Sequence, residues 1–236
     1  MKINSWQLIV PALAAGLQTV LAGDITGTIT LNGTPPEPAI IDMANFAACS
    51  AQHAEPVKTM FYVVGPNKGL KDVVVVVKDI TGKSAGASAE PLVLDQKGCE
   101  YIPYVSAVQT GQKIVIKNSD PTLHNVHIMP AAEGNSSRAK NLAQSQGDSF
   151  DWSFPAPEEF LKIKCDVHAW MFSYVTVVDS PYFAVTGKDG SFKIANVPPG
   201  KHTIEIMHRK AGKITKDVEV ADGSVTVDAA LEVPAK

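Results

Sequence analysis

The chain has 236 residues, with 21 basic and 24 acidic side chains and a formal net charge of −3. This length is enough for one large domain or two small ones. Because the charge is nearly balanced and no basic stripe is present to displace counterions from phosphates, nucleic acid is excluded as the expected partner.

The chain begins with a segment typical of exported proteins. Met1-Lys2 gives a short positive start, residues 8–21 are almost entirely apolar, and residues 20–22 are small or branched. This pattern predicts a signal peptide over residues 1–22, with the mature chain beginning near Gly23. An uncleaved membrane anchor is the alternative, although the apolar run is short for a spanning helix. We expect a periplasmic or secreted protein with no membrane span in its mature chain.

The next region has two predicted strands with irregular chain between them. Residues 25–31 alternate in side-chain type and end at Asn32-Gly33, which predicts a strand and a turn. The prolines within residues 35–38 predict an extended, irregular stretch. Residues 73–77 are five consecutive valines, which predicts a strand buried on both faces. Residues 84–90 are rich in Ala, Ser and Gly and predict a linker.

Seven segments of strand length follow, separated by turns that contain Gly, Pro, Asn and Asp. They are residues 91–94, 101–108, 113–117, 125–129, 149–154, 160–164 and 174–178. Residues 131–147 are polar and small, which predicts an exposed loop with at most a turn of helix. Seven strands at this spacing are typical of a β-sandwich or Greek-key barrel.

The last section of the chain repeats the pattern of short strands and tight turns. The predicted strands are residues 183–185, 190–194, 202–207, 216–220 and 224–229. Residues 180–236 alone are marginal in size for an independent hydrophobic core, so we expect strands from elsewhere in the chain to complete this unit.

One short loop has the residues of a metal site. Residues 165–171 read Cys-Asp-Val-His-Ala-Trp-Met and lie between two predicted strands. A thiolate, an imidazole and a thioether, joined by a second histidine, form the donor set of electron-transfer copper sites. We therefore expect one type 1 copper ion bound by His124, Cys165 and His168, with Met171 as the weak axial ligand. Four protein ligands leave no open position for a substrate, which favours electron transfer over catalysis.

Three neighbours of these ligands have expected roles of their own. Asn125 directly follows His124 and is expected to tie it to the Cys165 loop from outside the ligand shell. His127 is expected to be a strand residue and not a ligand, because the alternation of side chains along a strand directs it away. Trp170 is either a core residue or an exposed docking contact. Docking is favoured because partner surfaces are enriched in aromatic residues.

These motifs resemble the cupredoxins, in particular the amicyanin- and plastocyanin-like blue copper proteins. The Cys-x-x-His-x-x-Met spacing is similar to the short ligand loop of amicyanin-like proteins, and residues 124–127 (His-Asn-Val-His) resemble the motif whose first histidine binds copper. Residues 108–118 resemble the strands that precede that histidine. The resemblance covers residues 90–179 and implies a Greek-key cupredoxin sandwich, one type 1 copper and a redox partner such as a dehydrogenase or cytochrome. Ala169 departs from the family's loop, where a proline follows the histidine.

The flanking regions show a second resemblance. Residues 190–194 (Gly-Ser-Phe-Lys-Ile), followed by Asn-Val-Pro-Pro-Gly at 196–200, resemble the carboxypeptidase regulatory-like (transthyretin-like, starch-binding-like) β-sandwich. Strands like the opening strands of that fold sit near the N-terminus here. We therefore expect a composite second sandwich made of residues 23–88 and 180–236, with the copper domain inserted. This fold implies no catalytic residues, and a scaffold or docking role is favoured over carbohydrate binding.

The three cysteines allow one disulfide and leave one residue over. Disulfides persist in exported proteins. Because Cys165 belongs to the copper loop, Cys49 and Cys99 are expected to form the bridge. The alternative is a second metal site with Cys49, His53 and Cys99, which is an incomplete set for a closed site.

The sequence therefore predicts an all-β protein, with a cupredoxin sandwich and a second small sandwich, that carries single electrons between exported redox partners. One alternative is a copper handling or storage protein. Another is a carbohydrate- or protein-binding module with a vestigial metal site. We do not expect an enzyme such as a nitrite reductase or oxidase, because no second histidine cluster is present for a further copper ion.

Overall fold

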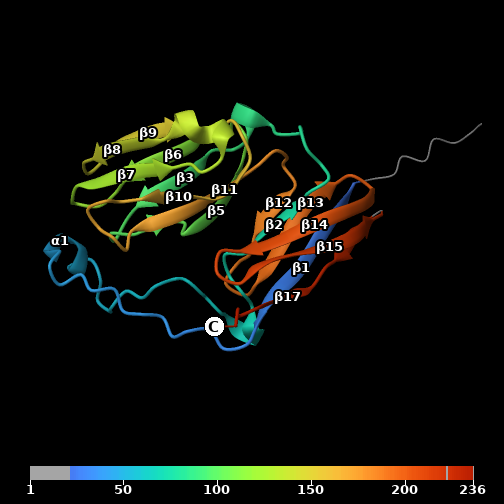
Figure 1. Ribbon diagram of the computed structural model, residues 1–236, viewed down its shortest axis with the longest axis horizontal. Helices are drawn as coiled ribbons and strands as arrows, with labels where there is room; N and C mark the ends of the chain where they lie inside the picture. The colour runs from blue at the N-terminus through green and yellow to red at the C-terminus, as the bar shows by residue number, and fades with distance from the viewer. Residues whose placement is uncertain (1–21, 222, 236) are drawn as a thin grey trace, which may run out of the picture.

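A computed structural model of the chain describes residues 22–221 and 223–235. The predicted signal peptide (1–22) lies outside the described residues, except for its last residue. The chain is nearly all β, as predicted, and forms two β-sandwiches that lie side by side (Figure 1). Among the described residues, every helix is too short or too polar to cross a membrane.

The flanking sandwich combines strands from both ends of the described chain. One sheet has the order β13–β1–β16, with β17 also pairing with β1, and the other has the order β12–β2–β14–β15. Its strands are β1 (Gly23–Asn32), β2 (Val74–Val77), β12 (Phe183–Val185), β13 (Ser191–Val197), β14 (Gly200–His208), β15 (Gly212–Val220), β16 (Ser224–Thr226) and β17 (Ala229–Glu232). The segment 224–229, predicted as one strand, thus contains two short strands that pair with different parts of β1.

The middle sandwich consists of β3 to β11. Its sheets have the orders β5–β11–β10–β7–β8 and β4–β3–β6–β9. Its strands are β3 (Leu92–Gln96), β4 (Tyr101–Ile102), β5 (Val105–Gln109), β6 (Ile114–Asn118), β7 (His124–Met129), β8 (Lys140–Gln144), β9 (Ser149–Trp152), β10 (Glu158–Lys164) and β11 (Phe172–Val178). Two 3₁₀ turns, η2 (Gly86–Ser88) and η3 (Glu133–Arg138), lie before β3 and before β8.

Two local predictions in this sandwich were wrong. Residues 101–108 do not form one strand. Pro103 cannot donate a backbone hydrogen bond, and the chain passes from β4, which pairs with β3, to β5, which pairs with β11. Residues 131–147 are not only a loop, because β8 pairs with β7 there. That edge strand was missed because Gln144 is its only buried residue, so the sequence lacks an apolar alternation.

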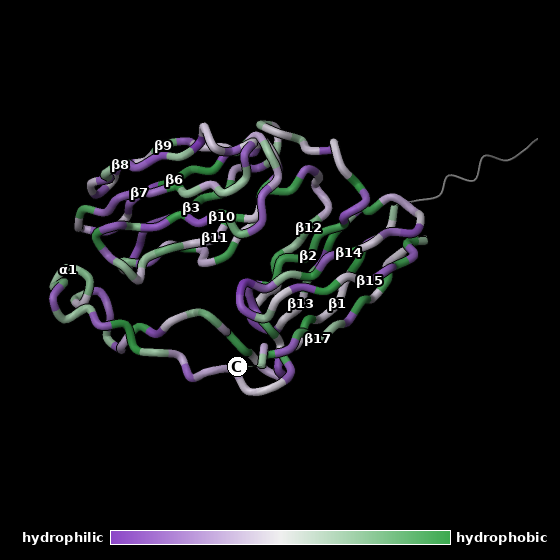
Figure 2. Tube along the Cα trace, viewed as in Figure 1, coloured by the Kyte–Doolittle hydropathy of each residue, from purple (hydrophilic) through white to green (hydrophobic). Residues whose placement is uncertain are grey.

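The valine strand β2 explains how the two sandwiches meet. Every residue of β2 is buried, as the run of valines predicted. Val75 and Val77 belong to the core of the flanking sandwich. Val74 and Val76 face the other way and pack with Tyr104 and other residues of the middle sandwich. Figure 2 shows this strand as strongly hydrophobic. One strand therefore supplies a core and an interface.

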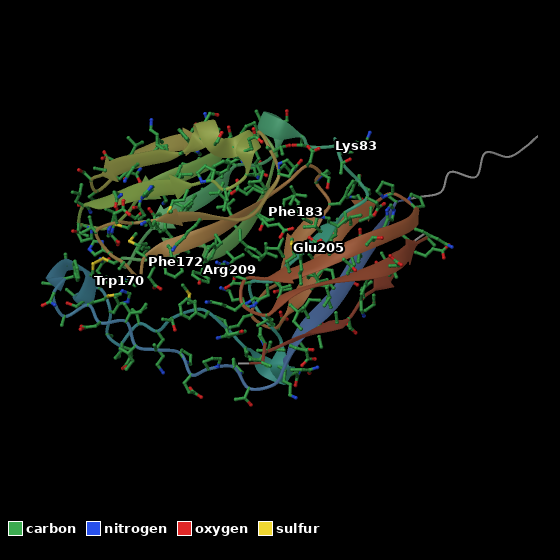
Figure 3. All side chains as sticks on the ribbon, viewed as in Figure 1. Lys83, Trp170, Phe172, Phe183, Glu205 and Arg209 are labelled. Atoms are coloured by element: carbon green, nitrogen blue, oxygen red, sulfur yellow. A yellow bond between two sulfur atoms is a disulfide. The ribbon has the colours of Figure 1, made fainter. Side chains whose placement is uncertain are left out.

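Further contacts between the sandwiches surround that apolar interface. Phe172, Phe183 and Arg209 lie in the region where the sandwiches approach each other (Figure 3). The guanidinium group of Arg209 lies 5.0 Å from the ring centre of Tyr174. Lys213 of β15 forms a salt bridge of 2.9 Å with a residue of β10, Glu159.

The segment between β1 and β2, residues 33–72, is named the strap here. It leaves the flanking sandwich, reaches the far end of the middle sandwich and returns (Figure 1). It contains α1 (Ala47–Ser50) and η1 (Pro66–Lys68). Cys49 of α1 forms the predicted disulfide with Cys99 of the middle sandwich, and Met43 is buried beside the bridge. The strap is therefore fixed covalently and by packing.

Candidate metal centre

The residues predicted as ligands come from two neighbouring loops of the middle sandwich. His124 is the first residue of β7, and Cys165 follows the last residue of β10. These strands pair antiparallel, which brings the start of β7 to the end of β10. The loop before β11 is closed by two backbone hydrogen bonds of 2.9 Å, from Cys165 to the carbonyl of Met171 and from Met171 to the carbonyl of His168.

Three donor atoms meet in the protein interior at this end of the sandwich. Nδ1 of His168 lies 3.1 Å from Nδ1 of His124 and 3.6 Å from Sγ of Cys165. The three side chains are between 0% and 3% exposed. Met171 is also buried and belongs to the same apolar cluster as Cys165. Burial to this degree leaves the donors facing one another and not water.

A buried carboxylate sets the orientation of His124. Oδ2 of Asp120 accepts a hydrogen bond of 2.8 Å from Nε2 of His124, and both side chains are fully buried. With its proton on Nε2, the imidazole has an unprotonated Nδ1 directed at the other donors. Asp120 also accepts hydrogen bonds from the backbone N–H groups of Gly98 and Cys99, at 2.6 and 2.7 Å. It therefore joins the metal centre to the disulfide.

The pKa values of these groups follow from the same contacts. Burial opposes ionisation of Asp120, but the hydrogen bonds from His124 and the two backbone N–H groups outweigh it and lower its pKa. Burial also disfavours the charged form of His124, yet Asp120 and the Cys165 sulfur outweigh it and raise the pKa of this imidazole. The Asp120 carboxylate that stabilises positive charge on this imidazole would also stabilise a metal cation bound to it.

The other two donors shift in the directions that favour metal binding. Burial raises the pKa of Cys165, but the contact with His124 and the nearby backbone N–H groups, that of Asn125 first, outweigh it and lower the pKa of the thiol. Thiolate is the form that binds metals. The pKa of His168 is lowered, mainly by burial and then by the charge of His124, which favours the neutral imidazole.

Asn125 ties the two loops together beside the donors. Its backbone N–H points at Sγ of Cys165, 3.5 Å away. Its side-chain oxygen accepts a hydrogen bond of 2.6 Å from the backbone N–H of Asp166, and its amide donates to Asn141. His127 lies apart from the three donors, half-buried, with Nδ1 2.9 Å from the Asp166 carboxylate.

The strap covers the other edge of His168. Nε2 of His168 lies 3.6 Å from Sγ of Cys49, and the Phe46 ring meets the imidazole edge-on with 4.9 Å between ring centres. Trp170 is half-buried and packs against Phe46. Its indole N–H donates a hydrogen bond of 3.0 Å to the carbonyl of Cys99. Trp170 thus holds the strap, and the docking role predicted for it stays a prediction.

The alternative second metal site is not formed. Cys49 and Cys99 are bonded to each other, and Nε2 of His53 lies 2.7 Å from the carbonyl oxygen of Gly98.

Two residues beside the candidate metal centre, Asp120 and Phe46, were not predicted from the sequence. Asp120 stands four residues before His124, within the polar segment Asn-Ser-Asp-Pro at residues 118–121, and this position was a usable signal. Phe46 had none, because nothing in the sequence places α1 against a loop so far along the chain.

The donor set fits copper better than other common ions. Two imidazoles, a thiolate and a nearby thioether are soft ligands that select copper, whereas Mg²⁺ and Ca²⁺ require oxygen. Two nitrogens bound to one ion by bonds of about 2.0 Å lie at most about 4 Å apart. The separation of 3.1 Å between the two Nδ1 atoms is compatible with that limit.

Several solved structures are similar to part of the chain, whereas no protein-family model and no curated protein matches it. An oxidised amicyanin variant is 18% identical, with a TM-score of 0.33, over 44% of this chain and 97% of that one. A purple cupredoxin from Nitrosopumilus maritimus is 21% identical, with a TM-score of 0.31, over 38% and 99%. The copper-containing nitrite reductase of Thermus scotoductus SA-01 is 17% identical, with a TM-score of 0.31, over 38% of this chain. The match covers only 23% of that enzyme, so this chain spans less than a quarter of its length.

Proposed function

We propose that the protein carries single electrons through one type 1 copper ion bound by His124, Cys165 and His168, with Met171 as a weaker ligand. The observation that carries this proposal is the meeting of the three donor atoms in the interior, all within 4.8 Å of one another. A closed set of protein ligands leaves no position for a substrate, which favours electron transfer over catalysis.

The protein's own residues hold this donor set in place. A bound copper ion would supply a one-electron redox couple. The hydrogen bond from His124 to Asp120 fixes the ring of the first ligand. The backbone N–H of Asn125 faces the Cys165 sulfur, and its side chain holds the next residue of that loop. A donor set braced in this way changes little when an electron arrives or leaves.

The cellular setting is part of the same proposal. We propose that residues 1–22 direct export to the periplasm or beyond, which agrees with a disulfide in the mature chain. The partners would be redox proteins such as a dehydrogenase or a cytochrome. We also propose that the flanking sandwich (residues 23–88 and 180–236) is one domain with the copper domain (residues 90–179) inserted. Both sheets of the flanking sandwich combine a strand from residues 23–88 with strands from residues 180–236, which supports this division.

Addition of Cu(II) to the purified protein tests the proposal. We expect one equivalent to give an intense visible colour from the Cys165 thiolate and a reversible one-electron wave in voltammetry. Cys165→Ser should abolish the colour, whereas the paired variant Cys49→Ser/Cys99→Ser should keep it. A colourless protein that binds only Cu(I) would instead indicate copper handling, and one that binds no copper would refute the proposal.

A further inference from the structure

A cavity of about 380 Å³ lies between the strap and the middle sandwich. This volume is in the range of small-molecule sites. Much of its wall is aromatic, with rings contributed by both the strap and the sandwich. These rings are Phe61, Tyr101, Tyr104, Trp170 and Phe172. Such walls favour a planar aromatic occupant, which can stack on some rings and meet others edge-on.

The cavity is adjacent to the metal centre. Ala169, Trp170 and Met171 line it, and they follow His168 in the loop that holds the metal donors. Tyr101, on another side, donates its hydroxyl proton to the carbonyl of Asn125. An occupant would therefore lie against the loop of the metal centre. It would not contact His168, which is not part of the cavity wall.

One polar group on the cavity wall is placed to orient an occupant. Glu100 is half-buried there, and burial raises the pKa of its carboxyl group. Among the hydrogen bonds and ion pairs of residues 22–221 and 223–235, none engages this carboxylate. The other charged wall residues, Asp42 and Lys58, are exposed. A half-buried carboxylate that no protein donor engages is free to accept a hydrogen bond from a ligand in the cavity. Because Asp42 and Lys58 have opposite charges and both are exposed, they give the wall little preference for a charged occupant.

We propose that this cavity binds a small planar phenol, an aromatic molecule of one or two rings whose hydroxyl group donates a hydrogen bond to Glu100. The site goes beyond the proposed electron transfer, and it does not depend on which metal the centre holds. Its place against residues 169–171 means that an occupant would contact the metal-binding loop directly.

Two probes that differ only in the hydroxyl group test this site: 2-naphthol and naphthalene. Binding would be followed by ¹⁵N NMR of the full mature chain, in the diamagnetic Cu(I) form and without metal. We expect 2-naphthol to bind with one equivalent and to shift the Trp170 indole signal in both forms. Because the metal-free protein is included, failure of the copper proposal would not obscure the result.

Variants of the cavity wall separate the two parts of the proposal, the hydrogen bond to Glu100 and the packing of the ligand against aromatic rings. Glu100→Gln should weaken 2-naphthol about ten-fold, the loss of one hydrogen bond to a charged group, and leave naphthalene unchanged. Glu90→Gln, an exposed residue away from the cavity, is the matched control and should change neither. Phe61→Ala removes a ring that is 37% exposed, so the fold should tolerate it, and it should weaken both probes.

Three results would overturn the inference. The first is that 2-naphthol shows no saturable binding, or shifts signals away from the cavity. The second is that Glu100→Gln affects both probes equally. The third is that the cavity signals move with protein concentration and not with the probe, which would assign the cavity to a second copy of the chain.

Discussion

The two sandwiches differ in what they bury. The flanking sandwich has a core of aliphatic residues such as Ile25, Ile29 and Ile206, and one of its buried polar side chains serves a turn. Nδ1 of His208 accepts the backbone N–H groups of Lys210 and Ala211. The middle sandwich buries a series of polar side chains in its interior.

Several of those polar side chains form one chain of hydrogen bonds that ends at the candidate metal centre. The amide of Gln96 donates to Gln144, and Asn118 donates to the carbonyl of Gln144. Asn118 accepts from the backbone N–H of Asp120, and Asp120 accepts from His124. A buried hydrogen-bond network of this kind fixes one arrangement of its side chains and replaces apolar packing at those positions. The comparison teaches that the polar interior of the middle sandwich holds the His124 side chain in place, whereas the core of the flanking sandwich is mainly aliphatic.

The largest expected effect comes from removing Asp120. Asp120→Ala leaves three buried donors without an acceptor, so the free energy of unfolding should fall by about 3 to 5 kcal/mol. Copper affinity should also fall by about 10- to 100-fold, because His124 loses its orienting partner. Chemical denaturation and competition with a copper chelator measure the two effects. Asp151→Ala, which removes an exposed salt bridge to Lys113, is the control and should change both little.

The disulfide variant Cys49→Ser/Cys99→Ser tests whether the strap shields His168 and the bound copper. The bridge spans a sequence separation of 50 residues, so its loss should reduce stability by about 4 kcal/mol. The strap would then be free to leave His168, and a chelator should remove copper from the variant faster than from the parent protein. An unchanged rate of copper removal would show that the strap does not shield the site.

A matched pair of core truncations separates effects on overall stability from effects on the position of the copper ligands. Ile163 and Ile206 are both fully buried, one in each sandwich. Replacement of either by alanine should reduce stability by about 3 kcal/mol. Ile163 lies two residues before Cys165, so Ile163→Ala should also shift the visible copper band. Ile206→Ala should leave the band unchanged. Equal spectral shifts in the two variants would break the proposed division between the sandwiches.

The smallest expected effect concerns acid stability of the flanking sandwich. Burial lowers the pKa of His208 to about 4, below the value near 6.5 of an unfolded histidine. Between these values the unfolded chain binds more protons, so stability is full above about pH 6.5 and falls as the pH drops toward 4. The loss, complete only below about pH 4, totals about 3 kcal/mol. Denaturation at several pH values should show a shallower slope for His208→Gln, and an unchanged slope would contradict this assignment.

The sequence made part of this fold predictable for physical reasons. The donor spacing around Cys165 and His168 is local, so it could be recognised without a structure. The all-valine segment at 73–77 indicated a strand with two buried faces. The polar edge strand β8 and the path of the strap could not be predicted. In β8 nearly every side chain is outside the core, and the strap depends on contacts between Phe46 and His168 that no local pattern encodes.

X-ray absorption at the copper edge tests the central claim most directly. The protein would be loaded with one equivalent of copper. The account predicts a nearest shell of one sulfur and two imidazole nitrogens, from Cys165, His124 and His168. Cys165→Ser should remove that sulfur from the shell. A shell with no sulfur in the parent protein, or one with two thiolate sulfurs that vanish in Cys49→Ser/Cys99→Ser, would contradict it.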